Sequence, residues 1–159
     1  MRRSVPAALV TLGVLAVSAT LQAQTGAGPL VVREAWSRAT PGGATVGAGY
    51  LVVENTGTSP DRLVGAEAEV AERVEIHETV ESGGVSRMRP VEVLVAAAGS
   101  RIEFRPNGRH LMLVDLKRAL KQGERFKGAL VFERAGRVPV EFEVRGIGAG
   151  AGHGAHTAH

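Results

Sequence analysis

The residues of this sequence best suited to bind a metal are two histidines and two methionines in two short segments. After Met1 the chain has only two methionines, and ahead of its last dozen residues it has only two histidines. VEIHETVESGGVSRMRP (74–90) holds His77 and Met88, and GRHLMLVDL (108–116) holds His110 and Met112. A single methionine is usually core filler, and a single histidine is more often a surface or satisfied core residue. It is the joint placement of the four that indicates a site.

Imidazole and thioether donors together favour one metal ion. Thioether sulfur is soft and selects Cu(I), whereas zinc prefers thiolate, imidazole or carboxylate, and calcium and magnesium prefer oxygen. The chain has no cysteine, so a blue-copper electron-transfer site, which needs a thiolate ligand, is not expected. These residues therefore predict a Cu(I) site built from neutral ligands.

Two strands are expected to present these side chains. In ERVEIHETV (72–80) apolar and polar residues alternate, which predicts a strand with one buried face and His77 on the polar face. A turn centred between Ser82 and Gly83 places His77 directly opposite Met88, within about 4.5–5.5 Å between Cβ atoms. A turn at Gly83 and Gly84 shifts the pairing by two and leaves the two residues diagonal on one face.

The first of these registers is the expected one, because it also pairs Glu78 with Arg87 and Val80 with Val85. In the second segment His110 and Met112 are separated by one residue, so on a strand they face the same way. Asp115 is an odd number of residues from His110 and is expected on the opposite face.

The rest of the sequence predicts an all-β domain, an antiparallel sandwich or barrel. Short valine-rich segments are separated by turn residues such as Gly, Pro, Asn and Asp. One helical turn, closed by Gly123, is expected in LKRALKQGE (116–124). The candidate strands are residues 31–38, 44–55, 61–68, 72–80, 84–94, 101–106, 109–117, 125–133 and 137–145.

Three regions are expected along the chain. Residues 1–23 have two arginines, an apolar run and a small-residue end, which is typical of a cleaved secretory signal peptide rather than a transmembrane anchor. Residues 24–147 form the folded domain. Residues 148–159, rich in Gly and Ala, form a flexible tail.

Composition argues against a nucleic-acid partner. The formal net charge is +3, but without Arg2 and Arg3 the chain has 17 basic and 16 acidic residues, and only six residues are aromatic. No basic cluster stands out. Stable membrane insertion of the folded domain is not expected either.

The tail contains three further histidines at a regular spacing: His153, His156 and His159. One interpretation is an unstructured terminus without a metal. The other is an accessory Cu(II) site, since imidazole nitrogen suits Cu(II).

The spacing His77-x10-Met88-x21-His110-x-Met112 resembles the ligand signature of the PCu(A)C family of periplasmic copper chaperones. The similarity also covers AWSRATPGGATVGAGYLVVENTG, DRLVGA, IHETVESGGVSRMRPVE, GRHLMLVDLKRALKQGE and LVFERAG, nearly all of residues 33–146. One departure is Ser86, where many members of the family have a second methionine.

The resemblance implies a cupredoxin-like antiparallel β-barrel or sandwich that binds one Cu(I) through His77, Met88, His110 and Met112. It implies a monomeric periplasmic protein that delivers copper to the Cu(A) centre of cytochrome c oxidase subunit II, alongside a Sco-type thiol protein.

Other functions follow from the same residues. One is periplasmic copper buffering or resistance, and another is a secreted β-sandwich interaction module in which the His/Met cluster is incidental. An enzyme is the least supported, because the sequence has no cysteine, no recognisable Ser/His/Asp arrangement and no phosphate-binding glycine loop.

Overall fold

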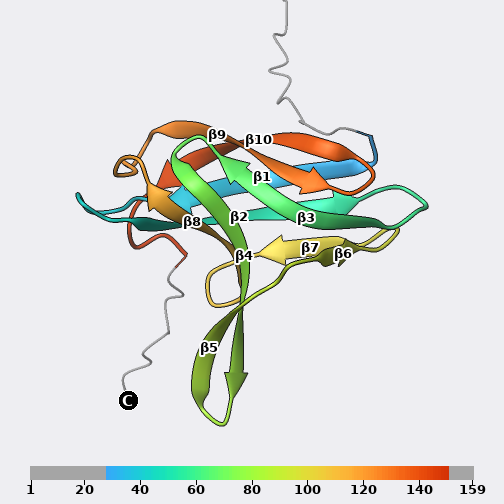
Figure 1. Cartoon of the computed structure of the whole chain (residues 1–159), viewed down its shortest axis with the longest axis horizontal. Coiled ribbons are helices and arrows are strands. Elements are labelled where there is room, and N and C mark those ends of the chain that lie inside the picture. The colour runs from blue at the N-terminus through green and yellow to red at the C-terminus, as the bar shows by residue number, and fades with distance from the viewer. Residues whose placement is uncertain (1–27, 151–159) are drawn as a thin grey trace, which may run out of the picture.

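Strands account for all the regular secondary structure in the computed structural model, which describes residues 28–150 (Figure 1). This range includes no helix long and apolar enough to span a membrane. The strands are β1 Leu30–Arg38, β2 Val46–Asn55, β3 Asp61–Ala68, β4 Ala71–Ser82, β5 Val85–Pro90, β6 Leu94–Ala96, β7 Arg101–Phe104, β8 Arg109–Leu116, β9 Arg125–Phe132 and β10 Gly136–Arg145.

Seven of the strands close into a barrel. Their order is β4-β8-β2-β1-β10-β9-β3, and the pairing of β3 with β4 completes the ring. All these pairs are antiparallel except β1 with β10, which is parallel. The expected all-β barrel is therefore confirmed. β5, β6 and β7 are additions that pair with β4, β3 and β2, respectively.

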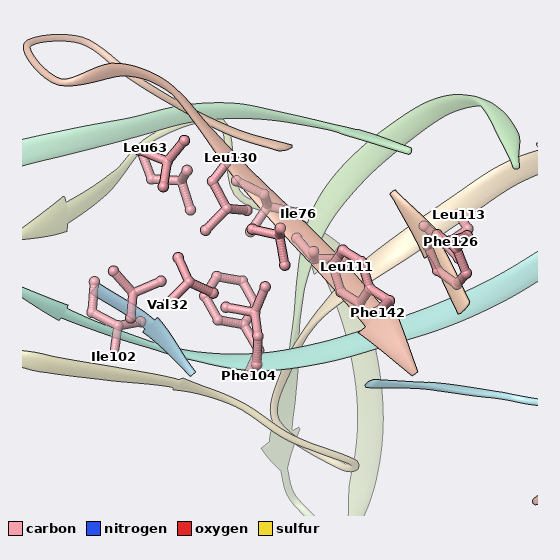
Figure 2. Close-up of a cluster of buried hydrophobic side chains, with 14 of the residues drawn as sticks. Val32, Leu63, Ile76, Ile102, Phe104, Leu111, Leu113, Phe126, Leu130 and Phe142 are labelled. Atoms are coloured by element: carbon pink, nitrogen blue, oxygen red, sulfur yellow. The ribbon is translucent and has the colours of Figure 1, made fainter. Parts of the chain in front are cut away.

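Strict alternation of apolar and polar residues produces the barrel interior. In β10 every second residue from Val138 to Val144 is buried and those between them are exposed, as expected for a strand with one face in a core. Phe142 stacks on Phe126 of β9 with ring centroids 5.0 Å apart. Figure 2 shows side chains from several strands, including Ile76 and Leu111, gathered in this interior. Each fully buried side chain of this size contributes about 1.5–3 kcal/mol of transfer free energy.

The expected single strand over residues 84–94 forms two strands, because its parts pair with different neighbours. β5 pairs with β4 and β6 pairs with β3, and Pro90, which has no N–H to donate, is the last residue of β5. In Figure 1 the β4–β5 hairpin extends away from the barrel.

The helical turn expected in residues 116–124 does not form. The backbone groups of Leu120 bond to Thr40 instead: Leu120 N–H donates to Thr40 Oγ1 (2.9 Å), and Thr40 N–H donates to the Leu120 carbonyl (2.9 Å). Leu120 is fully buried. Core packing of this side chain thus holds the segment as a loop, and Gly123 (φ 88°) lies in its turn.

Candidate metal site

The pairing of β4 with β8 brings the two candidate histidines together. His77 lies directly opposite His110 in the antiparallel register, and their ring centroids are 5.9 Å apart. Directly paired residues share a face, so both rings are on the outer side of this pair, while their neighbours Ile76 and Leu111 are buried in the core. The burial of Ile76 and Leu111 therefore determines which way the histidines face.

The two methionines reach this position from different strands. Met112 is paired with Glu75 on β4 and with Ala48 on β2, and it shares a face with His110, as predicted. Met88 comes from β5 on the projecting hairpin.

The expected hairpin register is wrong, and the alternative with the turn at Gly83 and Gly84 is the one that forms. Met88 pairs with Thr79, two residues from His77, so His77 and Met88 are diagonal on one face. Both turn glycines have positive φ, 60° and 75°. Two-residue hairpin turns of the kind that matches strand twist need positive φ at both positions, which glycine adopts without steric cost. A turn at Ser82 and Gly83 would force Ser82 into that conformation.

The observed register also pairs charges differently from the prediction. Glu78 lies opposite Arg89 rather than Arg87, and Arg89 donates to its carboxylate at 3.0 Å. Arg109 of β8 contacts the other oxygen of Glu78 at 3.0 Å. These ion pairs connect β5, β4 and β8 on the face opposite His77.

Three of the four candidate ligands, Met88, His110 and Met112, line one open pocket of about 320 Å³. Met88 is 61 % exposed, whereas the His77 side chain, beside His110, is only 14 % exposed. The exposure of the candidate ligands thus differs widely, from the largely buried imidazole of His77 to the exposed thioether of Met88. The other lining residues are Arg38, Thr40, Val46, Gly47 and Ala48.

Hydrogen bonds define which nitrogen of each histidine is free. His110 Nδ1 lies 3.0 Å from the Gly108 carbonyl oxygen, which can only accept, so Nδ1 carries the proton and Nε2 keeps its lone pair. His77 Nε2 lies 2.9 Å from Glu75 Oε2. A carboxylate also accepts only, so in His77 the lone pair is on Nδ1. This Nδ1 atom is buried and has no hydrogen-bond partner among residues 28–150.

Two hydrogen bonds to its oxygens favour the charged form of Glu75. The bond from Arg73 is the larger cause and the bond from His77 the next, and together they lower the pKa of Glu75. Arg73 Nε donates to Glu75 Oε1 at 3.0 Å, and Arg73 also donates to Asp115 Oδ2 at 2.6 Å.

Asp115 is therefore linked through Arg73 and Glu75 to His77, although strand alternation predicted that it faces away from the site. Its φ of 56° departs from the extended conformation and interrupts the alternation of β8.

The donor set suits a soft monocation. His77 lies beside His110, and His110 shares a pocket with Met88 and Met112. Imidazole and thioether ligands together favour Cu(I). Among the described residues no group of three His, Cys, Asp or Glu side chains could hold a metal ion. A site built from the harder donors that zinc or calcium prefer is thus not found in this part of the chain.

Two residues near the site were missed by the sequence reasoning as functional candidates. Glu75 precedes His77 by two residues, so alternation already placed both on one face, and this signal could have identified it. Arg38 had no such signal, because only the pairing of β1 with β2 and of β2 with β8 brings it to the pocket. The predicted signal peptide (1–23) and the tail histidines His153, His156 and His159 lie outside the described residues.

The closed barrel with its added hairpin defines the chain as a cupredoxin-like domain. The chain belongs to the family described as "Putative lipoprotein LpqE-like", which matches residues 30–144. A relative, "Putative lipoprotein Lxx21020" of Leifsonia xyli subsp. xyli, is 33 % identical over 115 residues, which cover 72 % of this chain and 68 % of the relative.

Solved structures of PCu(A)C domains share the fold. The "Copper-bound PCuAC domain from PmoF2" is 27 % identical with a TM-score of 0.65, covering 76 % of this chain and 96 % of that one. "CuI-DR1885" from Deinococcus radiodurans is 30 % identical with a TM-score of 0.58, covering 72 % and 76 %. The resemblance to the PCu(A)C family is thus confirmed.

Proposed function

We propose that this protein is a copper chaperone that binds one Cu(I) through His77, Met88, His110 and Met112. The observation that carries this proposal is the pairing of His77 with His110, whose ring centroids are 5.9 Å apart, beside a pocket that Met88, His110 and Met112 line. The copper-bound domain of PmoF2 and the Cu(I) form of DR1885 support it, because both are similar to this chain in fold and sequence.

The exposure of the ligands supports transfer by ligand exchange. The enclosed histidine would retain the ion, while Met88, 61 % exposed, is the ligand that an incoming donor can replace first. In this exchange the bond between Cu(I) and the Met88 sulfur breaks, and one bond between Cu(I) and the incoming donor forms. No chemistry on a substrate is required, so the proposed role is not enzymatic.

The proposed destination is the Cu(A) centre of cytochrome c oxidase subunit II, with a Sco-type thiol protein as a further partner. This part rests on the PCu(A)C resemblance. Export to the periplasm is supported by the lipoprotein description of the family and of the Leifsonia relative.

Copper buffering or resistance is the second candidate function. A contact near the C-terminal end of the described residues favours it. Arg38 Nε donates to the Ala149 carbonyl at 2.8 Å, and Arg38 also lines the pocket with Met88, His110 and Met112. His153, His156 and His159 follow Ala149 closely in the sequence. We propose that they offer an accessory Cu(II) site from which copper can pass to the pocket.

A Cu(I) competition titration against a chromogenic chelator, without oxygen and with reductant, tests the ligand set. Met88→Leu keeps the size of an exposed side chain, so its unfolding free energy should change by less than about 0.5 kcal/mol, while the Kd for Cu(I) rises at least about tenfold, or 1.4 kcal/mol. His110→Ala should lose tight binding. Val85→Ala, on the same strand and 52 % exposed, is the matched control and should bind as the wild type does. Full affinity in both site variants would refute the proposal and favour the interaction-module interpretation.

The destination is tested separately. The copper-loaded protein is mixed with the apo Cu(A) domain of subunit II, and copper is measured in each after separation. Delivery predicts copper in the acceptor, and loss of oxidase activity in cells without this protein. Normal oxidase activity together with increased copper sensitivity would instead support buffering.

A further inference from the structure

The carboxylate beside His77 has a fixed position that the ligand set alone does not explain. Glu75 Oε2 contacts His77 Nε2 at 2.9 Å, and its other oxygen accepts from Arg73 at 3.0 Å. Arg73 is held in turn by Asp115 at 2.6 Å. The carboxylate is thus restrained from the side away from the histidine.

This arrangement fixes the orientation of the imidazole ring. If the ring turned over about its Cβ–Cγ bond, the carbon Cε1 would take the place of Nε2, and the bond to Glu75 would be lost. With the bond in place, the protonated Nε2 faces Glu75 and cannot bind a metal. The remaining nitrogen, Nδ1, is buried and has no hydrogen-bond partner among the described residues, so it is the ring atom left free to bind a metal.

His110 is oriented in the opposite sense. Its Nδ1 donates to the backbone carbonyl of Gly108, so its free nitrogen is Nε2. The carbonyl belongs to the loop that precedes β8, and the same oxygen also accepts from Thr79 N–H at 3.2 Å. The two histidines therefore offer different nitrogens, each fixed by a different hydrogen-bond acceptor.

We propose that Glu75 is a positioning residue that holds His77 so that it binds Cu(I) through Nδ1, while His110 binds through Nε2. This inference rests on the proposed function and adds to it the atom used by each histidine and the residue that selects it. Glu75 does not contact the metal in this arrangement. A carboxylate that accepts the N–H of a metal-binding imidazole sets the orientation of the ring and raises its basicity. Loss of such a carboxylate typically lowers the metal affinity by about 10–100-fold.

The test is long-range proton–nitrogen NMR of the ¹⁵N-labelled full chain, without metal and with one equivalent of Cu(I), which is diamagnetic. The expected result is a protonated Nε2 of His77 in both states and a Cu(I)-induced shift of Nδ1. For His110 the shifted nitrogen is Nε2. A Cu(I)-induced shift of His77 Nε2 would overturn the inference and leave the proposed function intact. No shift at either histidine would overturn both.

Affinity measurements on three variants give a second readout. Glu75→Ala should raise the Kd for Cu(I) about tenfold. Glu75→Gln keeps an amide oxygen that can accept from Nε2, so it should restore most of the affinity and the Nδ1 shift. Glu72→Ala, on the same strand and paired among residues 28–150 only with Lys117 at 3.7 Å, removes the same charge and should leave the Kd unchanged. Equal Kd values for Glu75→Ala and Glu72→Ala, whether both raised or both unchanged, would overturn the positioning role.

Discussion

Replacing Gly84 with alanine is expected to weaken Cu(I) binding although the glycine contacts no ligand. Gly84 has a φ of 75°, and a Cβ added there would meet nothing within 4 Å. The cost is therefore only that of the left-handed backbone, about 1–2 kcal/mol for a non-glycine residue.

The cost should fall on the hairpin and not on the barrel. All six residues of β5 are exposed, so β5 can separate from β4 without opening the core, and an isolated two-stranded hairpin is only marginally stable. A chain with an open hairpin lacks Met88 at the site. The apparent Kd rises as the fraction of closed hairpin falls, and 1–2 kcal/mol raises it by at most about 5–30-fold.

Gly99→Ala is the matched control. Gly99 also has a positive φ, 68°, and open space around its Cβ position, but it lies between β6 and β7, which carry the buried residues Ala96 and Ile102. This change should lower the Tm by about 2–8 °C and leave the Kd for Cu(I) unchanged.

The assay is the anaerobic Cu(I) competition titration together with thermal unfolding of each variant. Opposite results are expected for the two variants: Gly84→Ala changes the Kd more than the Tm, and Gly99→Ala changes the Tm more than the Kd. If Gly84→Ala binds Cu(I) as tightly as the wild type, the closed Gly83–Gly84 turn is not what holds Met88 at the site.

Two further predictions concern the tail and the acid stability of the barrel. Truncation after Gly150 keeps the bond between Arg38 and Ala149; it should remove Cu(II) binding, measured by equilibrium dialysis, and retain one tight Cu(I), so loss of Cu(I) would contradict the separate sites. Burial tends to raise the pKa of Asp61, but backbone N–H donors from Arg134, Ala135 and Arg62 outweigh it and lower that pKa. The stability from Asp61 is therefore present above its unfolded pKa of about 3.9 and lost as pH falls through the lower folded value. Asp61→Asn should cost about 1–3 kcal/mol at neutral pH and flatten this acid dependence in urea unfolding, while the exposed Glu141→Gln should not; an unchanged acid limb in Asp61→Asn would refute the assignment.

Local patterns in the sequence were enough to predict the strands and the shared face of His110 and Met112. Both depend on the two-residue period of an extended chain, which can be recognised without knowing which strands pair. The single predicted strand over residues 84–94 failed because its halves pair with β4 and β3. The helical turn before Gly123 failed because burial of Leu120 outweighs a weak local preference.

The register of the hairpin shows where local rules conflict. Pairing Glu78 with Arg87 and Val80 with Val85 gave plausible cross-strand contacts, each worth about 0.2–1 kcal/mol. Left-handed backbone at Ser82 would cost about 1–2 kcal/mol, and the observed register avoids this cost while keeping a pair of opposite charges. The backbone conformation that the turn requires therefore determined the register, and in this register Glu78 forms its ion pair with Arg89.

The sequence by itself determined the soft donor set, the absence of thiolate and the spacing that relates this chain to the PCu(A)C family. Only the tertiary structure placed His77 opposite His110, connected Glu75 to His77 and brought Arg38 to the pocket. These contacts join residues far apart along the chain or depend on ring orientation. They result from the simultaneous burial of many apolar side chains in a closed barrel. This burial depends on the whole chain and cannot be predicted from any short segment.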